Sequence, residues 1–166
     1  MSYWQLFYHI VWSTKKRQPL ITPQIEPLIY DFLRAKAISL GGVVFAINGM
    51  EEHVHVVTSI PPRIAVAKFV GQLKGVSSAR INKIRNIAEP RFAWQGEYGV
   101  FSFDHKRLPN VVAYVNKQKE HHAANNLIPM LERDEGESAR LVSEDEIIYA
   151  VDDPLWWREM LTLPDR

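Results

Sequence analysis

The chain of 166 residues contains no cysteine. Disulfide bonds and zinc sites with thiolate ligands are therefore excluded, and the composition suits the reducing cytoplasm, where we expect this protein to act. No apolar run approaches the roughly 18 residues that a membrane helix needs, so we expect no membrane partner. Residues Met1–Gln5 lack the basic start and the apolar stretch of a signal peptide.

Acidic residues are scarce in most of the chain and abundant at its end. Residues 1–122 carry 16 Lys and Arg against 8 Asp and Glu, a net charge of +8, whereas residues 123–166 carry 4 against 11, a net charge of −7. A basic body indicates a polyanionic partner such as nucleic acid. The acidic end could be a solvated tail, a cover over the basic face or a partner-binding segment.

The length suits one domain with an appendage. We place the domain at residues 1–128 and an acidic extension at residues 129–166. Within the extension, Ser143–Glu146 has the pattern of a helix capping box, and Asp153–Trp157 has that of a second helix start. Two adjacent tryptophans in the second segment indicate that this end of the chain docks on another surface.

Strand-like and helix-like stretches follow one another in the order β-α-β-β-α-β, and one further helix comes after them. This order predicts an α+β fold of the ferredoxin-like, split βαβ type, with an antiparallel sheet, helices on one face and an added tyrosine-bearing helix. Asn48-Gly49 is a turn signal that predicts a hairpin between the second and third strands. The candidate strands are Leu6–Thr14, Val43–Ile47, Glu51–Ile60, Arg91–Trp94 and Val100–Phe103, and the candidate helices are one that begins at Thr22, Ile64–Ile84 and Val111–His122.

His53 and His55 are the first candidate site residues. They belong to a stretch rich in β-branched residues that ends at Pro61-Pro62, which is typical of a strand. Side chains at i and i+2 project from the same face of a strand, so both imidazoles could reach one metal ion. The alternative is a pair of histidines on a polar sheet face without any ligand.

Tyr114 and Gln118 form the second candidate pair. They are four residues apart in a predicted helix and therefore share one of its faces. A tyrosine can act as a covalent nucleophile, and a glutamine oxygen can bind a hard metal ion. The alternative is that the Tyr114 ring packs in the core and that Gln118 is solvated.

The two motifs together resemble those of the single-tyrosine HUH transposases of small bacterial insertion sequences (TnpA type), including the REP-associated tyrosine transposases. These have His-hydrophobe-His on a strand and Tyr-x-x-x-Gln on a later helix. The resemblance extends from about Tyr3 to His122, and it implies the same ferredoxin-like fold. Four further pieces carry it in matching order and spacing: Tyr8–Lys15, Phe69–Gly75, Trp94–Gln95 and Tyr98–Ser102.

This resemblance implies a metal-dependent transposase or endonuclease that cleaves and rejoins single-stranded DNA at hairpin-bearing ends. Tyr114 would attack the scissile phosphorus and form a 5′-phosphotyrosine intermediate, while His53, His55 and Gln118 would hold Mg²⁺ or Mn²⁺. One catalytic tyrosine per chain implies two protomers or two rounds of cleavage, and we expect a homodimer. Such an enzyme acts at the nucleoid of a bacterial cytoplasm.

Basic residues in two segments are candidate DNA contacts. Lys15, Lys16 and Arg17 follow the first strand, and Lys74, Arg80 and Lys83 lie in the second predicted helix. Such residues can contact phosphates. The alternatives are an ordinary polar turn and a solvated helix face.

Two other functions stay open. The chain could be a module of the same fold that binds DNA hairpins without cleaving them, but the presence of His53, His55, Tyr114 and Gln118 favours an enzyme. It could also be a metal-dependent hydrolase in which Tyr114 is structural and water attacks. A denaturing gel distinguishes these cases, because only a tyrosine nucleophile leaves protein attached to DNA.

Overall fold

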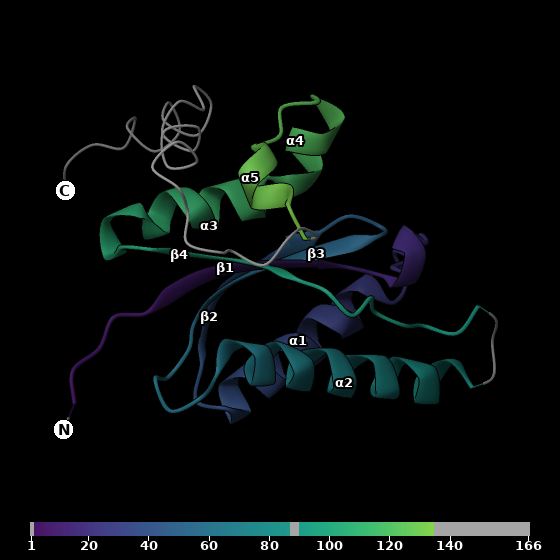
Figure 1. Cartoon of the computed structure of the whole chain (residues 1–166). Helices are drawn as coiled ribbons and strands as arrows, with labels where there is room; N and C mark the ends of the chain where they lie inside the picture. The colour runs from purple at the N-terminus through teal and green to yellow at the C-terminus, as the bar shows by residue number, and fades with distance from the viewer. Residues whose placement is uncertain (1, 87–89, 135–166) are drawn as a thin grey trace.

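The computed structural model describes residues 2–86 and 90–134 (Figure 1). The acidic extension from residue 135 onward, with both helix starts expected there, lies outside the described residues. The elements in chain order are β1 (Phe7–Ser13), η1 (Lys15–Arg17), α1 (Glu26–Ser39), β2 (Val43–Gly49), β3 (His53–Ser59), α2 (Val66–Arg85), β4 (Gly99–Phe103), η2 (His105–Arg107), α3 (Leu108–Asn116), α4 (Gln118–Ala123) and α5 (Pro129–Glu132).

The strands form one antiparallel sheet in the order β2-β3-β1-β4. The helix α1 connects β1 to β2, α2 connects β3 to β4, and both helices cover the same face of the sheet (Figure 1). This is the split βαβ arrangement, so the predicted ferredoxin-like α+β fold is confirmed. The tyrosine-bearing helix α3 covers the opposite face, together with α4 and α5 (Figure 1).

Side chains that alternate along the two central strands build a core on each face of the sheet. Ile10 and Trp12 of β1 and Val56 of β3 belong to the core that α1 and α2 complete. Val57 of β3 belongs to the other core, which includes buried side chains of α3 and α5. Since residues i and i+2 share a face, His53 and His55 project from β3 on the same side as Val57, toward α3.

The Asn48-Gly49 turn prediction is wrong, because β2 continues through both residues. The Asn48 amide has partners within the folded chain: its Nδ2 donates to the carbonyl oxygen of Asn116 at 3.0 Å, and its Oδ1 accepts from Lys119 Nζ at 3.0 Å. The hairpin itself is present, with its turn at residues 50–52, where Met50 N donates to the His53 carbonyl at 3.0 Å.

The strand predicted at Arg91–Trp94 is also absent, and Trp94 makes only an isolated bridge to Thr14. The Asn82 side chain makes the hydrogen bonds that a neighbouring strand would otherwise make with the backbone of this segment. The Asn82 amide accepts from Phe92 N at 2.9 Å and donates to the Phe92 carbonyl at 2.8 Å, so this backbone is satisfied without a ladder.

The helix boundaries differ from the prediction at two places. The first helix begins at Glu26, because residues 22–25 form a preceding turn in which the Thr22 carbonyl accepts from the nitrogens of Ile25 and Glu26. The predicted helix Val111–His122 is divided into α3 and α4 at Lys117, whose φ of −99° and ψ of 17° are not helical.

Gly49 permits a close approach in the hairpin that carries His53. A methyl group there would overlap the His53 carbonyl oxygen and lie 2.9 Å from the Val54 Cα. We expect Gly49→Ala to lower the free energy of unfolding by about 1–3 kcal/mol, as overpacking does, measured by urea denaturation. The control is Gly71→Ala, since a Cβ at Gly71 meets nothing within 4 Å. Equal losses in the two variants would contradict the prediction.

Candidate active site

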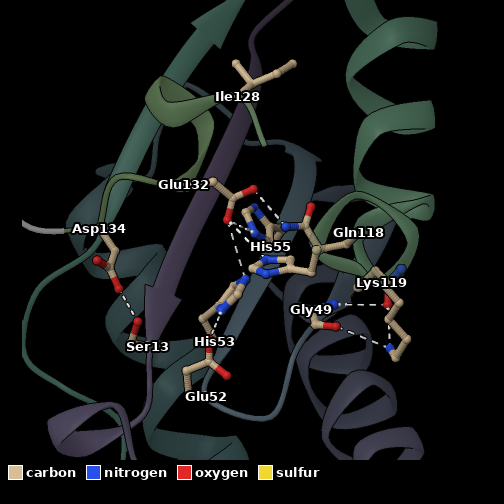
Figure 2. Close-up of polar contacts among 12 residues, drawn as sticks. Ser13, Gly49, Glu52, His53, His55, Gln118, Lys119, Ile128, Glu132 and Asp134 are labelled. Atoms are coloured by element: carbon tan, nitrogen blue, oxygen red, sulfur yellow. Dashed lines mark hydrogen bonds and ion pairs between the residues drawn. The ribbon is translucent and has the colours of Figure 1, made fainter. Parts of the chain in front are cut away.

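The side chains of His53 and His55 project from β3 toward Glu132 (Figure 2). Each Nδ1 atom has a partner: His53 Nδ1 lies 3.0 Å from Glu52 Oε1, and His55 Nδ1 lies 2.8 Å from His9 Nε2. Partners of this kind fix the ring orientation of metal-binding histidines. The two Nε2 atoms are buried and lie 3.5 Å (His53) and 3.2 Å (His55) from Glu132 Oε2, with no hydrogen bond to any other described residue. Imidazole nitrogens held in this way could bind a metal ion.

Tyr114 and Gln118 reach the same place although the helix breaks between them. Both side chains are buried, one on α3 and the other at the first residue of α4. The Tyr114 hydroxyl accepts from Ile128 N at 3.1 Å, and its ring lies edge-on to His55 with centroids 6.5 Å apart. Gln118 Oε1 is buried without a hydrogen-bond partner in the described part of the chain, so an oxygen ligand is also available.

Glu132 of α5 lies between the two histidines and Gln118 (Figure 2), and it also bonds to Tyr114. Its Oε1 accepts hydrogen bonds from the Tyr114 hydroxyl and from Gln118 Nε2, the latter at 2.7 Å. Its Oε2 lies 3.2 Å from His55 Nε2 and 3.5 Å from His53 Nε2. The structure therefore gathers the four residues predicted from the sequence around one carboxylate.

His122 of α4 adds a further nitrogen to this cluster. Its Nε2 lies 3.7 Å from Glu132 Oε2, and its ring centroid lies 5.0 Å from that of His53. His53, His122 and Glu132 each offer a ligand atom within 4.8 Å of the others. Imidazole and carboxylate groups so placed fit a divalent metal ion.

The electrostatics of the cluster also suit a cation. Burial alone would raise the pKa of Glu132, but its interactions with His55, Tyr114 and Gln118 hold that pKa below its usual range. Burial lowers the pKa of His55 and of His122, so neutral imidazoles are favoured. An ionised carboxylate and neutral imidazoles are the forms that bind a metal.

Sequence reasoning missed four members of this cluster: His9, Glu52, His122 and Glu132. The register between β1 and β3 sets Val11 opposite His55, and His9 therefore projects from the same face of the sheet as His55. Glu132 was missed because it falls in the segment assigned to the acidic extension.

The predicted DNA contacts lie in different places. Lys15, Lys16 and Arg17 are exposed in η1, and Arg17 is ion-paired with Asp134 at 3.1 Å between Nη1 and Oδ1. Arg80 and Lys83 are exposed on α2, which lies on the sheet face away from the tyrosine helix (Figure 1). Their contacts with DNA stay predictions.

Lys74 of α2 is partly buried and bound within the chain. Its Nζ donates to the carbonyl oxygens of Gln95, Gly96 and Glu97 at 3.1, 3.2 and 2.7 Å. A lysine ammonium has three N–H donors, and all three have acceptors here. Burial lowers the pKa of Lys74 to about 8. Lys74 therefore holds the loop at residues 95–97, and a phosphate contact would have to replace one of these bonds.

Lys119 fixes α4, and with it Gln118, to the body. Its Nζ donates to Glu26 Oε1, to Asn48 Oδ1 at 3.0 Å and to the Gly49 carbonyl at 3.2 Å. We expect Lys119→Met to lower the free energy of unfolding by about 1–2 kcal/mol, because the bonds are partly exposed. Urea denaturation measures this, and Lys117→Met, at the neighbouring exposed lysine, is the control. An equal effect of both substitutions would contradict the prediction.

Comparison of the sequence with those of known proteins finds similarity to transposases. A sequence model of the IS200-like transposase family matches residues 2–118. The ISDra2 transposase TnpA of Deinococcus radiodurans is 26% identical over 125 residues, which cover 70% of this chain and 86% of that protein. The transposase for insertion sequence element IS200 of Salmonella typhimurium is 29% identical over 75 residues, or 45% of this chain and 49% of that protein.

Two solved structures share the fold. A proposed transposase from Deinococcus radiodurans has a TM-score of 0.56 and 22% identity, over 76% of this chain and 95% of that one. A REP-associated tyrosine transposase bound to a REP hairpin has a TM-score of 0.54 and 12% identity, over 76% of each chain. No helix among the described residues is long and apolar enough to span a membrane.

Proposed function

Because this chain belongs to the family of IS200-like transposases, we propose that it cleaves and rejoins single-stranded DNA at hairpin-bearing ends through a 5′-phosphotyrosine intermediate. One observation carries the proposal. The Tyr114 hydroxyl and two buried imidazole nitrogens, His53 Nε2 and His55 Nε2, lie around the same Glu132 carboxylate. A nucleophile beside a metal site is the arrangement that phosphodiester transfer requires.

Tyr114 is the nucleophile in this proposal. Its phenolic oxygen forms a bond to the scissile phosphorus, the bond from phosphorus to the 3′-oxygen breaks, and the proton lost by the phenol is matched by one gained at the leaving 3′-hydroxyl. The DNA is left joined to Tyr114 through its 5′-phosphate. Rejoining reverses the step with another 3′-hydroxyl, so the phosphodiester energy is conserved and no ATP is needed.

His53, His55 and Gln118 would hold Mg²⁺ or Mn²⁺ at this site. When bound, the ion supplies Lewis-acid polarisation of the phosphate. The protein contributes the fixed orientation of the ligands, through Glu52 behind His53 and His9 behind His55. Burial of both imidazoles keeps water away from nitrogens that would otherwise be solvated.

The DNA partner is proposed to be a single strand with a hairpin. A protein of the same fold is a REP-associated tyrosine transposase bound to a REP hairpin, and this supports the proposal for the present chain. The exposed lysines of η1, Lys15 and Lys16, lie directly after β1 and could contact the phosphates. One catalytic tyrosine per chain means that two strand cleavages need two protomers or two rounds, and we propose a homodimer.

A hairpin-binding module without cleavage is the second candidate, and the cluster argues against it. Pure binding gives no reason to bury two imidazole nitrogens against a carboxylate, next to a glutamine oxygen without a partner in the described part of the chain, because burying such polar groups costs free energy. A metal ion would satisfy them.

The decisive experiment uses single-stranded DNA from the flanks of the gene itself, incubated with the full chain and Mg²⁺ or Mn²⁺. A covalent protein–DNA adduct on a denaturing gel supports the proposal. Cleavage without an adduct would indicate a hydrolase in which water attacks. Binding without cleavage in either metal would indicate the binding module.

DNA binding should depend on strandedness and on salt. We expect hairpin-bearing single strands to bind more tightly than random duplex of the same length. Between about 50 and about 200 mM salt the Kd should rise about 10-fold or more, because bound phosphates release counterions. The double substitution Lys15→Ala and Lys16→Ala should make the salt dependence shallower. Fluorescence anisotropy measures both effects, and equal affinity for random duplex would count against this function.

A further inference from the structure

Residues 128–134 are built into the body rather than lying loosely on it. Ile128 and Leu131 are buried in the core beneath α3, and Ile128 N donates to the Tyr114 hydroxyl at 3.1 Å. At the end of the segment, buried Asp134 accepts from Ser13 Oγ, from Gln95 Nε2 at 3.1 Å and from Arg17 Nη1 at 3.1 Å. Anchors on both sides therefore fix the position of Glu132.

We propose that Glu132 is a ligand of the divalent ion, supplied by this segment in addition to the histidine pair. The inference rests on the proposed metal-dependent function and goes beyond the residues that the family motifs identify. Its basis is the position of Glu132 Oε2, which lies 3.2 Å from His55 Nε2 and 3.5 Å from His53 Nε2. Neighbouring ligands of an octahedral ion with bonds near 2.1 Å are about 3.0 Å apart, so each of these two separations suits a carboxylate oxygen and an imidazole nitrogen that bind the same ion.

Charge supports the same assignment. Two neutral imidazoles and an amide oxygen would leave both positive charges of the ion uncompensated in a buried site, which is costly. One carboxylate offsets half of that charge. Mg²⁺ and Mn²⁺ also prefer oxygen ligands, and carboxylates above all.

The second oxygen of Glu132 gives the ligand a further role. Because Oε1 accepts from the Tyr114 hydroxyl and from Gln118 Nε2, the carboxylate is oriented with Oε2 toward the imidazoles. One rigid group thus sets the separation between the nucleophile on α3 and the metal site on β3. Glu132 is a positioning residue for Tyr114 and a direct ligand for the ion.

Mn²⁺ binding by the full-length protein, measured by calorimetry and by the electron paramagnetic resonance signal of free Mn²⁺, tests the inference without any activity assay. We expect Glu132→Gln, which keeps the shape and removes the charge, to weaken Mn²⁺ binding about 10-fold or more. Glu120→Gln, at an exposed carboxylate of α4, should leave the affinity within about 2-fold of wild type. Circular dichroism confirms that each variant is folded.

The possible failures are distinguishable. If wild type binds Mn²⁺ and Glu132→Gln binds it equally well, Glu132 is no ligand, while the proposed metal site of His53 and His55 stands. If Glu132→Gln binds Mn²⁺ more tightly, the carboxylate competes with the ion, and the inference is overturned. If wild type binds no Mn²⁺, the metal-dependent function fails together with the inference.

Discussion

Tyr114→Phe is expected to abolish the covalent protein–DNA adduct and to lower the cleavage rate by about 10⁴-fold or more, as removal of a nucleophile does. Phenylalanine keeps the ring and its packing in the core between the sheet and α3. The hydroxyl donates to the Glu132 carboxylate and accepts from Ile128 N, so its removal should cost about 1.5–3 kcal/mol of stability. The effect on catalysis therefore far exceeds the effect on the fold. Denaturing gels measure the adduct, and urea denaturation measures the stability.

Tyr98→Phe is the matched control for this substitution. Tyr98 is a partly buried tyrosine that packs against the core that α1 and α2 complete, on the other face of the sheet. This variant should form the adduct at the wild-type rate. An adduct that persists in Tyr114→Phe and vanishes in Tyr98→Phe would overturn the assignment of the nucleophile.

His55→Ala is expected to remove Mn²⁺ binding and to lower the cleavage rate by about 10³-fold, which corresponds to the several kcal/mol that a metal contributes to phosphoryl transfer. His53→Ala should act in the same way, because the Nε2 atoms of both residues face the same carboxylate. Hairpin binding should change by less than about 2-fold, since it depends on phosphate contacts elsewhere. Calorimetry, cleavage assays and anisotropy measure the three quantities.

His105→Ala is the control for the histidine substitutions, because His105 is an exposed histidine of η2 at the other end of β1. It should retain Mn²⁺ binding and cleavage. Full cleavage by His55→Ala at ordinary Mg²⁺ concentrations would show that the histidine pair holds no essential metal. Loss of hairpin binding in His55→Ala alone would indicate instead that the substitution disturbs the fold.

Local patterns predicted those parts of the fold that local physics controls. The strand predicted at Glu51–Ile60 and the helix predicted at Ile64–Ile84 appear in the structure as β3 and α2, apart from the ends of the elements. Predictions from local sequence were wrong where residues distant in the sequence supply the hydrogen bonds. Lys119 and Asn116 bind the Asn48 side chain and keep Asn48-Gly49 inside a strand, and Asn82 replaces a strand partner for Phe92.

By itself, the sequence determined the strand that carries both histidines, because this depends on the two-residue period of a strand. The spacing of Tyr114 and Gln118 predicted one helical face, but the helix is divided at Lys117, so the fold brings Gln118 to the site. Only the tertiary structure decided what surrounds them. The pairing of β1 with β3 places His9 behind His55, and the return of α5 across the sheet inserts Glu132 between His55 and Tyr114. Such contacts join residues 18 or more positions apart, and no local period of the chain encodes them.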